Sequence, residues 1–212
     1  MSIEYLDRYF HFDKSLIKAD PTFVEIGSYS GGNMKRLLRS FPEARIIIYE
    51  AGLENFKKLK SVYEEIGSPS NVSIYNQAVS RSEGEITFFE YKEKPSSNSI
   101  FERHTKKKDL VVERKHTVKS TNIAGIIKSN GLSNIDVIFA NAEGIEIMLL
   151  DEVSLDKEVG SAVSQLCLSM HERIVGKEAI RKALDDASKL YSIKRGDGKW
   201  ACHLFRRKDL SK

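Results

Sequence analysis

The chain has 212 residues, of which 41% are hydrophobic and 30% charged, and its formal net charge is +4. The length suits one domain with its own core, and the composition is ordinary for a globular protein. The charge is too small to indicate a polyanionic partner. No run approaches the roughly 20 apolar residues of a membrane span, and the N-terminus lacks the apolar core of a signal peptide. We therefore expect a cytoplasmic protein without a membrane span.

The two cysteines, Cys167 and Cys202, lie far apart in apolar runs and have no metal-ligand spacing. This pattern predicts two buried thiols in a reducing compartment and no metal site.

In the first part of the chain, apolar runs of strand length alternate with segments of helical period. Residues 1–20 mix apolar and charged side chains, which predicts an amphipathic helix packed on the domain or acting as a lid. The domain itself is predicted over residues 21–207. Its first strands are expected at residues 22–27, 45–50 and 72–76. The first helix is predicted from apolar positions at i, i+3, i+4 and i+7, namely Met34, Leu37, Leu38 and Phe41.

The middle of the chain is less regular. Residues 85–91 form a further predicted strand, which a turn at residues 82–84 would join to the third strand as a hairpin. A polar stretch over residues 92–109 is long for a connection inside a compact domain, and such loops tend to be functional or disordered. Residues 110–119 indicate an extended segment.

The second half returns to the alternation. We predict a helix over residues 121–130, buried strands over residues 135–140 and 162–170, each followed by a helix, and a final hairpin. The hairpin joins residues 190–195 and 199–206 through a turn at residues 196–198. The whole pattern predicts a single α/β domain with a mostly parallel seven-stranded sheet, a C-terminal antiparallel hairpin and helices on both faces.

Open α/β sheets bind ligands beyond the carboxyl ends of their strands, so the residues after each strand form the candidate site. The first strand leads into an acid-x-Gly-x-x-x-Gly sequence made by Glu25, Gly27 and Gly31. This loop is one residue wider than the dinucleotide fingerprint, which counts against an NAD-dependent oxidoreductase. It suits an amino-acid-like ligand, with the ammonium near the acid and the carboxylate at backbone N–H groups. A purely structural glycine turn is the alternative.

Other strand ends carry further candidates. Glu50 follows the second strand about 20 residues past the glycine loop, where an acidic side chain reaches the hydroxyls of a ribose. Gln77 and Ala78 follow the third strand and either line an adenine edge or form a plain turn. Asn141 and Glu143 follow the 135–140 strand, where an Asn is often simply an N-cap.

The sequence resembles the FkbM-type family, which belongs to the large class of Rossmann-like methyltransferases. The resemblance runs over residues 21–172 and is carried by residues 24–31, 49–51, 76–79 and 135–146. It implies a single-domain Rossmann-like methyltransferase fold and S-adenosylmethionine as the cofactor. The glycine loop would hold the methionine part, and the acid after the second strand would hold the ribose. The cofactor-binding residues that it implies are Glu25, Gly27, Ser28, Tyr29, Gly31, Glu50, Ala51, Gln77, Ala78 and Asn141.

The sequence departs from the family pattern near the 135–140 strand. The family usually shows Asp-Val-Glu-Gly, often with a Lys two residues before the Asp. Here Asn141 stands at the Asp position and Phe139 at the Lys position, while Glu143 and Gly144 are kept. Glu25 likewise stands where Asp is more usual. Asn141 motivates an alternative hypothesis, a methyltransferase-fold module that binds the cofactor without turnover.

Members of the family typically methylate hydroxyls of sugars or secondary metabolites, so the resemblance implies a small-molecule or glycan acceptor. Methyl transfer from a sulfonium depends mainly on positioning, and a base assists a hydroxyl nucleophile. His171 is the predicted base and Glu143 the second predicted catalytic residue. The predicted acceptor contacts are Ser97, Ser99 and Glu172. A histidine that only hydrogen-bonds at a strand end is the alternative for His171.

Lys, Arg and His side chains cluster between residues 103 and 119. A solvated loop and an edge strand rich in lysine explain them without a ligand, whereas a surface for an acidic acceptor is the sharper hypothesis. The aromatic-proline acceptor motif of amino-methylating DNA enzymes is missing, so a nucleic-acid partner is disfavoured. The oligomeric state is open, with a homodimer as one option.

Overall fold

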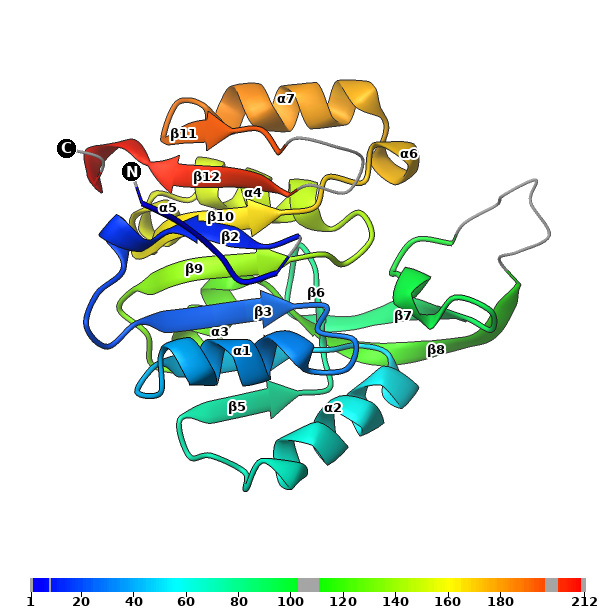
Figure 1. Ribbon diagram of the computed structural model, residues 1–212. Helices are drawn as coiled ribbons and strands as arrows, with labels where there is room; N and C mark the ends of the chain where they lie inside the picture. Colours follow the sequence, from blue (N-terminus) through cyan, green and yellow to red (C-terminus); the bar gives the residue numbers. More distant parts are fainter. Residues whose placement is uncertain (1, 8, 103–110, 197–201, 211–212) are drawn as a thin grey trace.

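A seven-stranded sheet forms the centre of the computed structural model, which describes residues 2–7, 9–102, 111–196 and 202–210. The strand order is β11-β12-β10-β9-β3-β4-β5 (Figure 1). β12 is antiparallel to both of its neighbours, and the other neighbouring pairs are parallel. The strands are β3 (Thr22–Ile26), β4 (Arg45–Tyr49), β5 (Val72–Tyr75), β9 (Ile135–Ala140), β10 (Val163–Leu168), β11 (Tyr191–Lys194) and β12 (His203–Arg207). The predicted fold class is confirmed; the predicted turn at residues 196–198 lies largely outside the described residues.

Helices cover both faces of this sheet. They are α1 (Gly32–Ser40), α2 (Leu53–Glu65), α3 (Ile123–Ser129), α4 (Glu146–Leu155), α5 (Lys157–Ala162), α6 (Glu172–Val175) and α7 (Lys177–Ala187). Apolar side chains of α1 and α2 pack on one face, and those of α3, α4, α5 and α7 pack on the other. Within the described ranges, no helix has the length and apolar character needed to cross a membrane.

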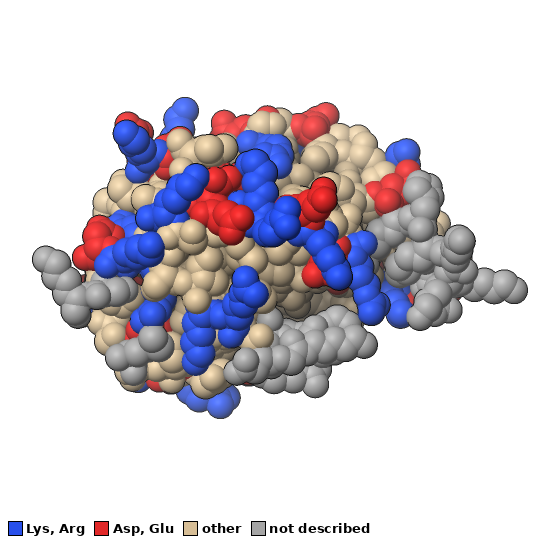
Figure 2. Space-filling model, turned by 90° about the horizontal axis from the view of Figure 1, so that it is seen from above, with Lys and Arg blue, Asp and Glu red and all other residues tan. Residues whose placement is uncertain are grey.

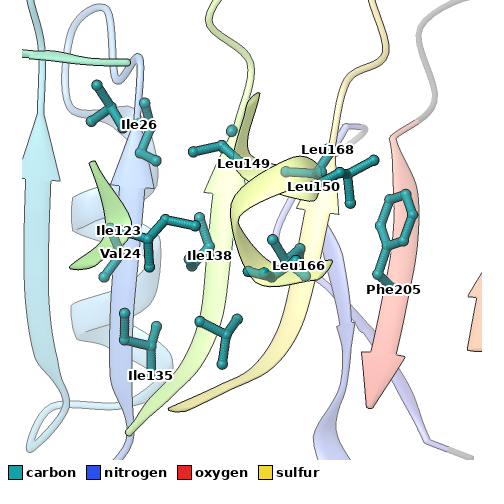
Figure 3. Packing of buried hydrophobic residues seen from close by; sticks show 14 of the residues in the cluster. Val24, Ile26, Ile123, Ile135, Ile138, Leu149, Leu150, Leu166, Leu168 and Phe205 are labelled. Atoms are coloured by element: carbon teal, nitrogen blue, oxygen red, sulfur yellow. The ribbon is translucent and has the colours of Figure 1, made fainter. Parts of the chain in front are cut away.

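The central strands are buried because each face meets its own hydrophobic cluster. In β3, Phe23 packs with the α1 side, whereas Val24 and Ile26 pack with the α4 side, as the alternation of side chains along a strand requires. Figure 3 shows the α4 side, where Leu149 and Leu150 lie over the sheet. All six residues of β9 are buried, which is typical of a central parallel strand. Glu25 therefore lies on the Phe23 face, towards α1.

A second, three-stranded sheet lies beyond the carboxyl ends of β3 and β9 (Figure 1). It consists of β6 (Ala78–Val79), β8 (Val112–Thr121) and β7 (Gly84–Tyr91). The predicted hairpin between the third strand and residues 85–91 is wrong, because β7 pairs antiparallel with β8 along its length. The chain leaves the central sheet after β5: the Asn76 amide donates to the carbonyls of Glu50 and Ala51, at 2.9 and 3.1 Å.

The N-terminal segment is a β-hairpin, so the predicted amphipathic helix over residues 1–20 is wrong. β1 (Ile3–Tyr5) pairs antiparallel with β2 (His11–Asp13), and a short 3-10 helix, η1 (Lys14–Leu16), follows. The Asp7 carboxylate turns the chain by accepting hydrogen bonds from the backbone N–H groups of Tyr9 and Phe10, both at 2.7 Å. Phe12 is then buried against the sheet.

The two cysteines lie in this same part of the core. Cys167 of β10 and Cys202 are both buried and carry free thiols, as predicted from their apolar neighbours. The backbone N–H of His11 donates to the Cys167 sulfur at 3.4 Å, which helps to hold β2 against β10.

Charges of both signs are interspersed on the face seen from above in Figure 2, on the side where α7 lies in Figure 1. On α7, Asp186 pairs with Lys182 at 3.0 Å and with Lys189 at 2.7 Å.

Candidate functional site

Two adjoining cavities open at the point where the strand order reverses, between β3 and β9. The narrow cavity, of about 110 Å³, lies against the ends of β3 and β4, and the wide cavity, of about 650 Å³, lies against the loop after β3 and the N-terminal hairpin. Both are lined by Gly27, Tyr29, Ser96, Asn141 and Glu143. This is the crevice in which doubly wound sheets bind ligands, and the predicted loops meet there.

The loop between β3 and α1 is shaped by backbone conformations that favour glycine. Gly27 has φ +80°, and a Cβ atom there would lie 2.9 Å from the Asn141 carbonyl oxygen and 3.1 Å from the Ala142 Cβ. Gly31 has φ +76° and forms the N-cap of α1. Tyr29 also lies in the left-handed region, with φ +57°, and is a partly exposed wall of both cavities. The loop therefore approaches the end of β9 more closely than a side chain at residue 27 would permit.

Glu25 is a buried carboxylate at the floor of the wide cavity. Its side chain accepts hydrogen bonds from Asn33 at 2.8 Å and from Ser28 at 3.1 Å. Burial raises its pKa from 4.5 to about 7; the two hydrogen bonds oppose the rise, and the negative charges of Asp7 and Glu50 add to it. A cationic group in this cavity would stabilise the ionised form.

Glu50 joins the loops after β3 and β4. One carboxylate oxygen accepts from the Tyr29 N–H at 2.8 Å and the other from the Gly52 N–H at 2.9 Å. Burial raises the pKa of Glu50, against the effect of these hydrogen bonds and one from Asn55. A carboxylate has about four lone-pair directions, so these three bonds still leave acceptor capacity towards the narrow cavity, which Glu50 lines.

The rest of the narrow cavity combines apolar walls with a few polar side chains, the usual character of a ligand pocket. The predicted residues Ala51, Gln77, Ala78 and Asn141 all line it. The sequence reasoning missed Asn55, which follows Glu50 on the first turn of α2, a spacing that would have pointed to it. Asn98, from the 96–99 segment that was expected to shape the acceptor pocket, also lines this narrow cavity.

The loop after β9 is a tight turn around a buried carboxylate. Glu146 accepts from the backbone N–H groups of Ala142 and Gly144, both at 2.9 Å. Glu143 has φ +58° and Gly144 has φ +112°. α4 begins at Glu146 with Ile145 as its N-cap, so Asn141 is not the N-cap of this helix.

His171 lies between two carboxylates on the wall of the wide cavity. Its Nδ1 is 3.0 Å from Oε1 of Glu146, and its Nε2 is 3.6 Å from Oε1 of Glu143. The structure thus brings together the two predicted catalytic residues. It adds Glu146, which was not among the site residues predicted from the sequence.

The three predicted acceptor contacts occupy different places. Ser97 lines the wide cavity. Ser99 is buried and lines neither cavity; its hydroxyl donates to the Glu143 carbonyl at 3.0 Å and accepts from the Phe101 N–H at 3.0 Å. Glu172 also lies outside both cavities, and its carboxylate is 3.8 Å from Lys177. Ser97 alone of the three is therefore placed to contact a ligand in the wide cavity.

Phe139 and the described part of the basic stretch line neither cavity. Phe139, at the position where the resemblance would place a Lys, stacks in the core with ring centroids 5.2 Å from Phe10 and 6.1 Å from Phe23. Of the basic stretch, residues 103–110 fall outside the described residues. Arg114 and Lys115 lie on β8, with Arg114 3.5 Å from Glu90 and Lys115 over the Phe89 ring.

Among the residues that the structure describes, no three His, Cys, Asp or Glu side chains are arranged to hold a metal ion.

Comparisons with known proteins agree with the fold. No protein-family model and no curated protein matches the sequence. A chain of the fibrillarin/Nop5p complex matches with a TM-score of 0.50 and 12% identity, over 90% of this chain and 73% of that one. TrmK of M. capricolum, in complex with S-adenosyl-homocysteine, matches with a TM-score of 0.49 and 10% identity, over 92% of this chain and 65% of that one. Precorrin-6y C5,15-methyltransferase of Geobacter metallireducens GS-15 matches with a TM-score of 0.47 and 12% identity, over 89% of this chain and 82% of that one.

The chain spans about two thirds to four fifths of the length of these three proteins. At such low identity the likeness concerns the fold alone. With the strand order β11-β12-β10-β9-β3-β4-β5, it confirms the Rossmann-like methyltransferase fold expected from the sequence.

Proposed function

We propose that this protein is an S-adenosylmethionine-dependent methyltransferase. The observation that carries the proposal is the pair of adjoining cavities at the switch point, one containing Glu50 and the other Glu25. In this proposal the adenosine part occupies the narrow cavity, where Glu50 binds the ribose hydroxyls and Gln77 and Ala78 lie along the adenine. The residues shared by both cavities then surround the sulfonium group.

The amino-acid end of the cofactor would lie in the wide cavity. Its carboxylate would meet the backbone of the loop that holds Ser28 and Gly31, while its ammonium would be compensated by Glu25 and Asp7. Buried carboxylates around a cationic ligand also explain why the fold retains Glu25 at a position where burial opposes its charge.

We further propose a hydroxyl acceptor on a sugar, a glycan or a small metabolite. The wall of the wide cavity also carries the polar side chains of Ser96, Ser97, Lys94 and His171. The acceptor oxygen attacks the methyl carbon, the carbon–sulfur bond breaks, and S-adenosylhomocysteine leaves as the neutral thioether. His171 Nε2 takes the hydroxyl proton, and Glu143 stabilises the imidazolium that results.

The resemblance to the FkbM-type family supports the hydroxyl acceptor, and Asn141 distinguishes this chain from the usual family pattern. Asn141 lines both cavities, so its amide is available to the cofactor even though it carries no charge. A cofactor-binding module without turnover is the competing hypothesis.

The test is transfer of a radiolabelled methyl group from S-adenosylmethionine to a panel of sugars, glycans and hydroxylated metabolites. We expect transfer to at least one hydroxyl acceptor and a loss of about 100-fold or more in kcat for His171→Ala, the usual size of a general-base contribution. Glu178→Gln, an exposed change on α7, is the control and should leave the rate unchanged. Cofactor binding without transfer to any acceptor would support the module instead.

A further inference from the structure

Glu146 lies at the centre of the acceptor end of the site, although it lines neither cavity. It is almost completely buried, and its two oxygens accept from the N–H groups of Ala142 and Gly144. Oε1 is also 3.0 Å from Nδ1 of His171. The two backbone N–H groups donate to this buried carboxylate, and His171 Nδ1 is a third nitrogen within hydrogen-bond distance of it.

From this geometry we propose that Glu146 is the positioning residue of the site: it holds the neutral His171 imidazole in the tautomer with the proton on Nδ1, and it folds residues 142–144 so that Glu143 faces Nε2. The role in catalysis rests on the proposed function, whereas the tautomer is inferred from the contact between Nδ1 and Glu146. The direct Nδ1 contact at 3.0 Å is within hydrogen-bond range, and the Nε2 contact with Glu143 at 3.6 Å is longer. The carboxylate at Nδ1 therefore decides which nitrogen keeps the proton.

The turn that presents Glu143 is fixed from both sides. On one side Glu146 holds the N–H groups of its neighbours, and on the other the Ser99 hydroxyl holds its carbonyl oxygen at 3.0 Å. A Cβ atom at Gly144 would lie 3.0 Å from Ile174 and 3.1 Å from Phe101, so these side chains would have to shift, and its φ of +112° favours glycine. The left-handed conformation of Glu143 is thus imposed by its surroundings, as is typical of strained residues at functional sites.

The charges around His171 have a definite arrangement. Glu143 and Glu146 are the two carboxylates that contact the ring, at 3.6 and 3.0 Å. Further charged groups on the wall of the wide cavity are Asp7, Glu25, Arg36 and Lys94. On the element of His171 itself, Glu172 and Arg173 are exposed. Removal of the Glu146 charge should therefore change the tautomer and the proton affinity of His171 more than removal of any exposed carboxylate does.

The experiment is ¹H–¹⁵N correlation of the histidine side chains over a pH titration, for the unmodified protein and for Glu146→Gln. In the unmodified protein we expect neutral His171 to carry its proton on Nδ1. In Glu146→Gln we expect its pKa to fall by about one unit or more, that is, a tenfold or larger change in proton affinity, with the tautomers mixed. Glu178→Gln should leave both readouts unchanged. His171→Ala identifies the signal.

Glu146→Asp keeps the charge but shortens the side chain. The pKa of His171 should therefore stay close to its value in the unmodified protein, whereas the two tautomers should be mixed. This variant and the unmodified protein keep the test decisive if Glu146→Gln unfolds. An Nε2 proton in the unmodified protein, or an unchanged His171 pKa in folded Glu146→Gln, would overturn the proposal. The two proposals separate clearly, because an Nδ1 tautomer without methyl transfer would contradict only the proposed function. When activity is measured, the acidic limb of the kcat–pH profile should shift with the pKa of His171.

Discussion

The ionised form of Glu25 lowers the stability of the folded protein, and the size of this effect depends on pH. Its pKa is raised from 4.5 to about 7, so the folded state binds the proton more tightly than the unfolded chain. Stability is therefore lost as pH rises from about 4.5 to about 7. We expect Glu25→Gln to be more stable than the unmodified protein at pH 8, by up to about 3 kcal/mol, and to lose this advantage near pH 4. Urea unfolding at both pH values measures this.

The exposed Glu43→Gln change is the control for that experiment and should show no such pH dependence. A difference between Glu25→Gln and the unmodified protein that is the same at both pH values would contradict the raised pKa of Glu25.

The same residue predicts how cofactor affinity varies with pH. A cationic ligand favours the ionised carboxylate, so binding of S-adenosylmethionine should release a proton from Glu25 and strengthen as pH rises from 6 to 8. Calorimetric titrations at several pH values measure this trend, which should be much reduced in Glu25→Gln. Affinity that falls over this range would show that Glu25 does not face the cationic part of the ligand.

Glu143 is a second residue at which function and stability oppose each other. Its φ of +58° is unfavourable for a side chain by about 1–2 kcal/mol, whereas glycine adopts it readily. Glu143→Gly should therefore leave the free energy of unfolding unchanged or raise it by up to about 1 kcal/mol, while methyl transfer falls. Glu143→Ala also removes the carboxylate but keeps the strained backbone, so it should be less stable than the glycine variant. The reverse order of stability would contradict the strain.

At the scale of elements, the N-terminal hairpin is part of the core. Phe12 of β2 is fully buried, with ring centroids 5.9 Å from Phe23 and 6.1 Å from Phe139. Phe12→Ala should lower the free energy of unfolding by about 3–5 kcal/mol, the usual cost of removing a buried aromatic ring. Tyr5→Ala on β1 removes a ring that is 65% exposed and should have little effect. A loss below about 1 kcal/mol for Phe12→Ala would indicate a detachable lid instead.

Local pattern predicted some elements well and others poorly. The 135–140 strand was predicted to the residue, because a run that is apolar except for Asp136 and is bounded by polar residues leaves little choice. The N-terminal helix was wrong because the Asp7 turn and the alternation of Phe10 and Phe12 outweigh the helical period. The pairing of β7 with β8 joins segments separated by a long loop, and such long-range pairing leaves no local signal.

At the scale of the molecule, topology explains which site residues the sequence could identify. Parallel strands bring their carboxyl ends to one edge, so residues such as Glu25, Glu50 and Asn141 were predictable from strand ends alone. The burial of Ser99 depends on how the 92–102 loop packs against the turn after β9. The contact of Glu146 with His171 depends on the pairing of β9 with β10, and the periodicity of the sequence indicates neither.

The most direct test of the central claim is calorimetric titration of the protein with S-adenosylmethionine and S-adenosylhomocysteine, beside Glu50→Ala and Glu90→Ala. Glu90 is a matched control, since it is also a buried carboxylate next to α2 but lines neither cavity. We predict micromolar binding, which corresponds to about −8 kcal/mol, with affinity at least about tenfold weaker in Glu50→Ala and retained in Glu90→Ala. No binding by the unmodified protein, or equal binding by Glu50→Ala, would contradict the cofactor site proposed at the ends of β3 and β4.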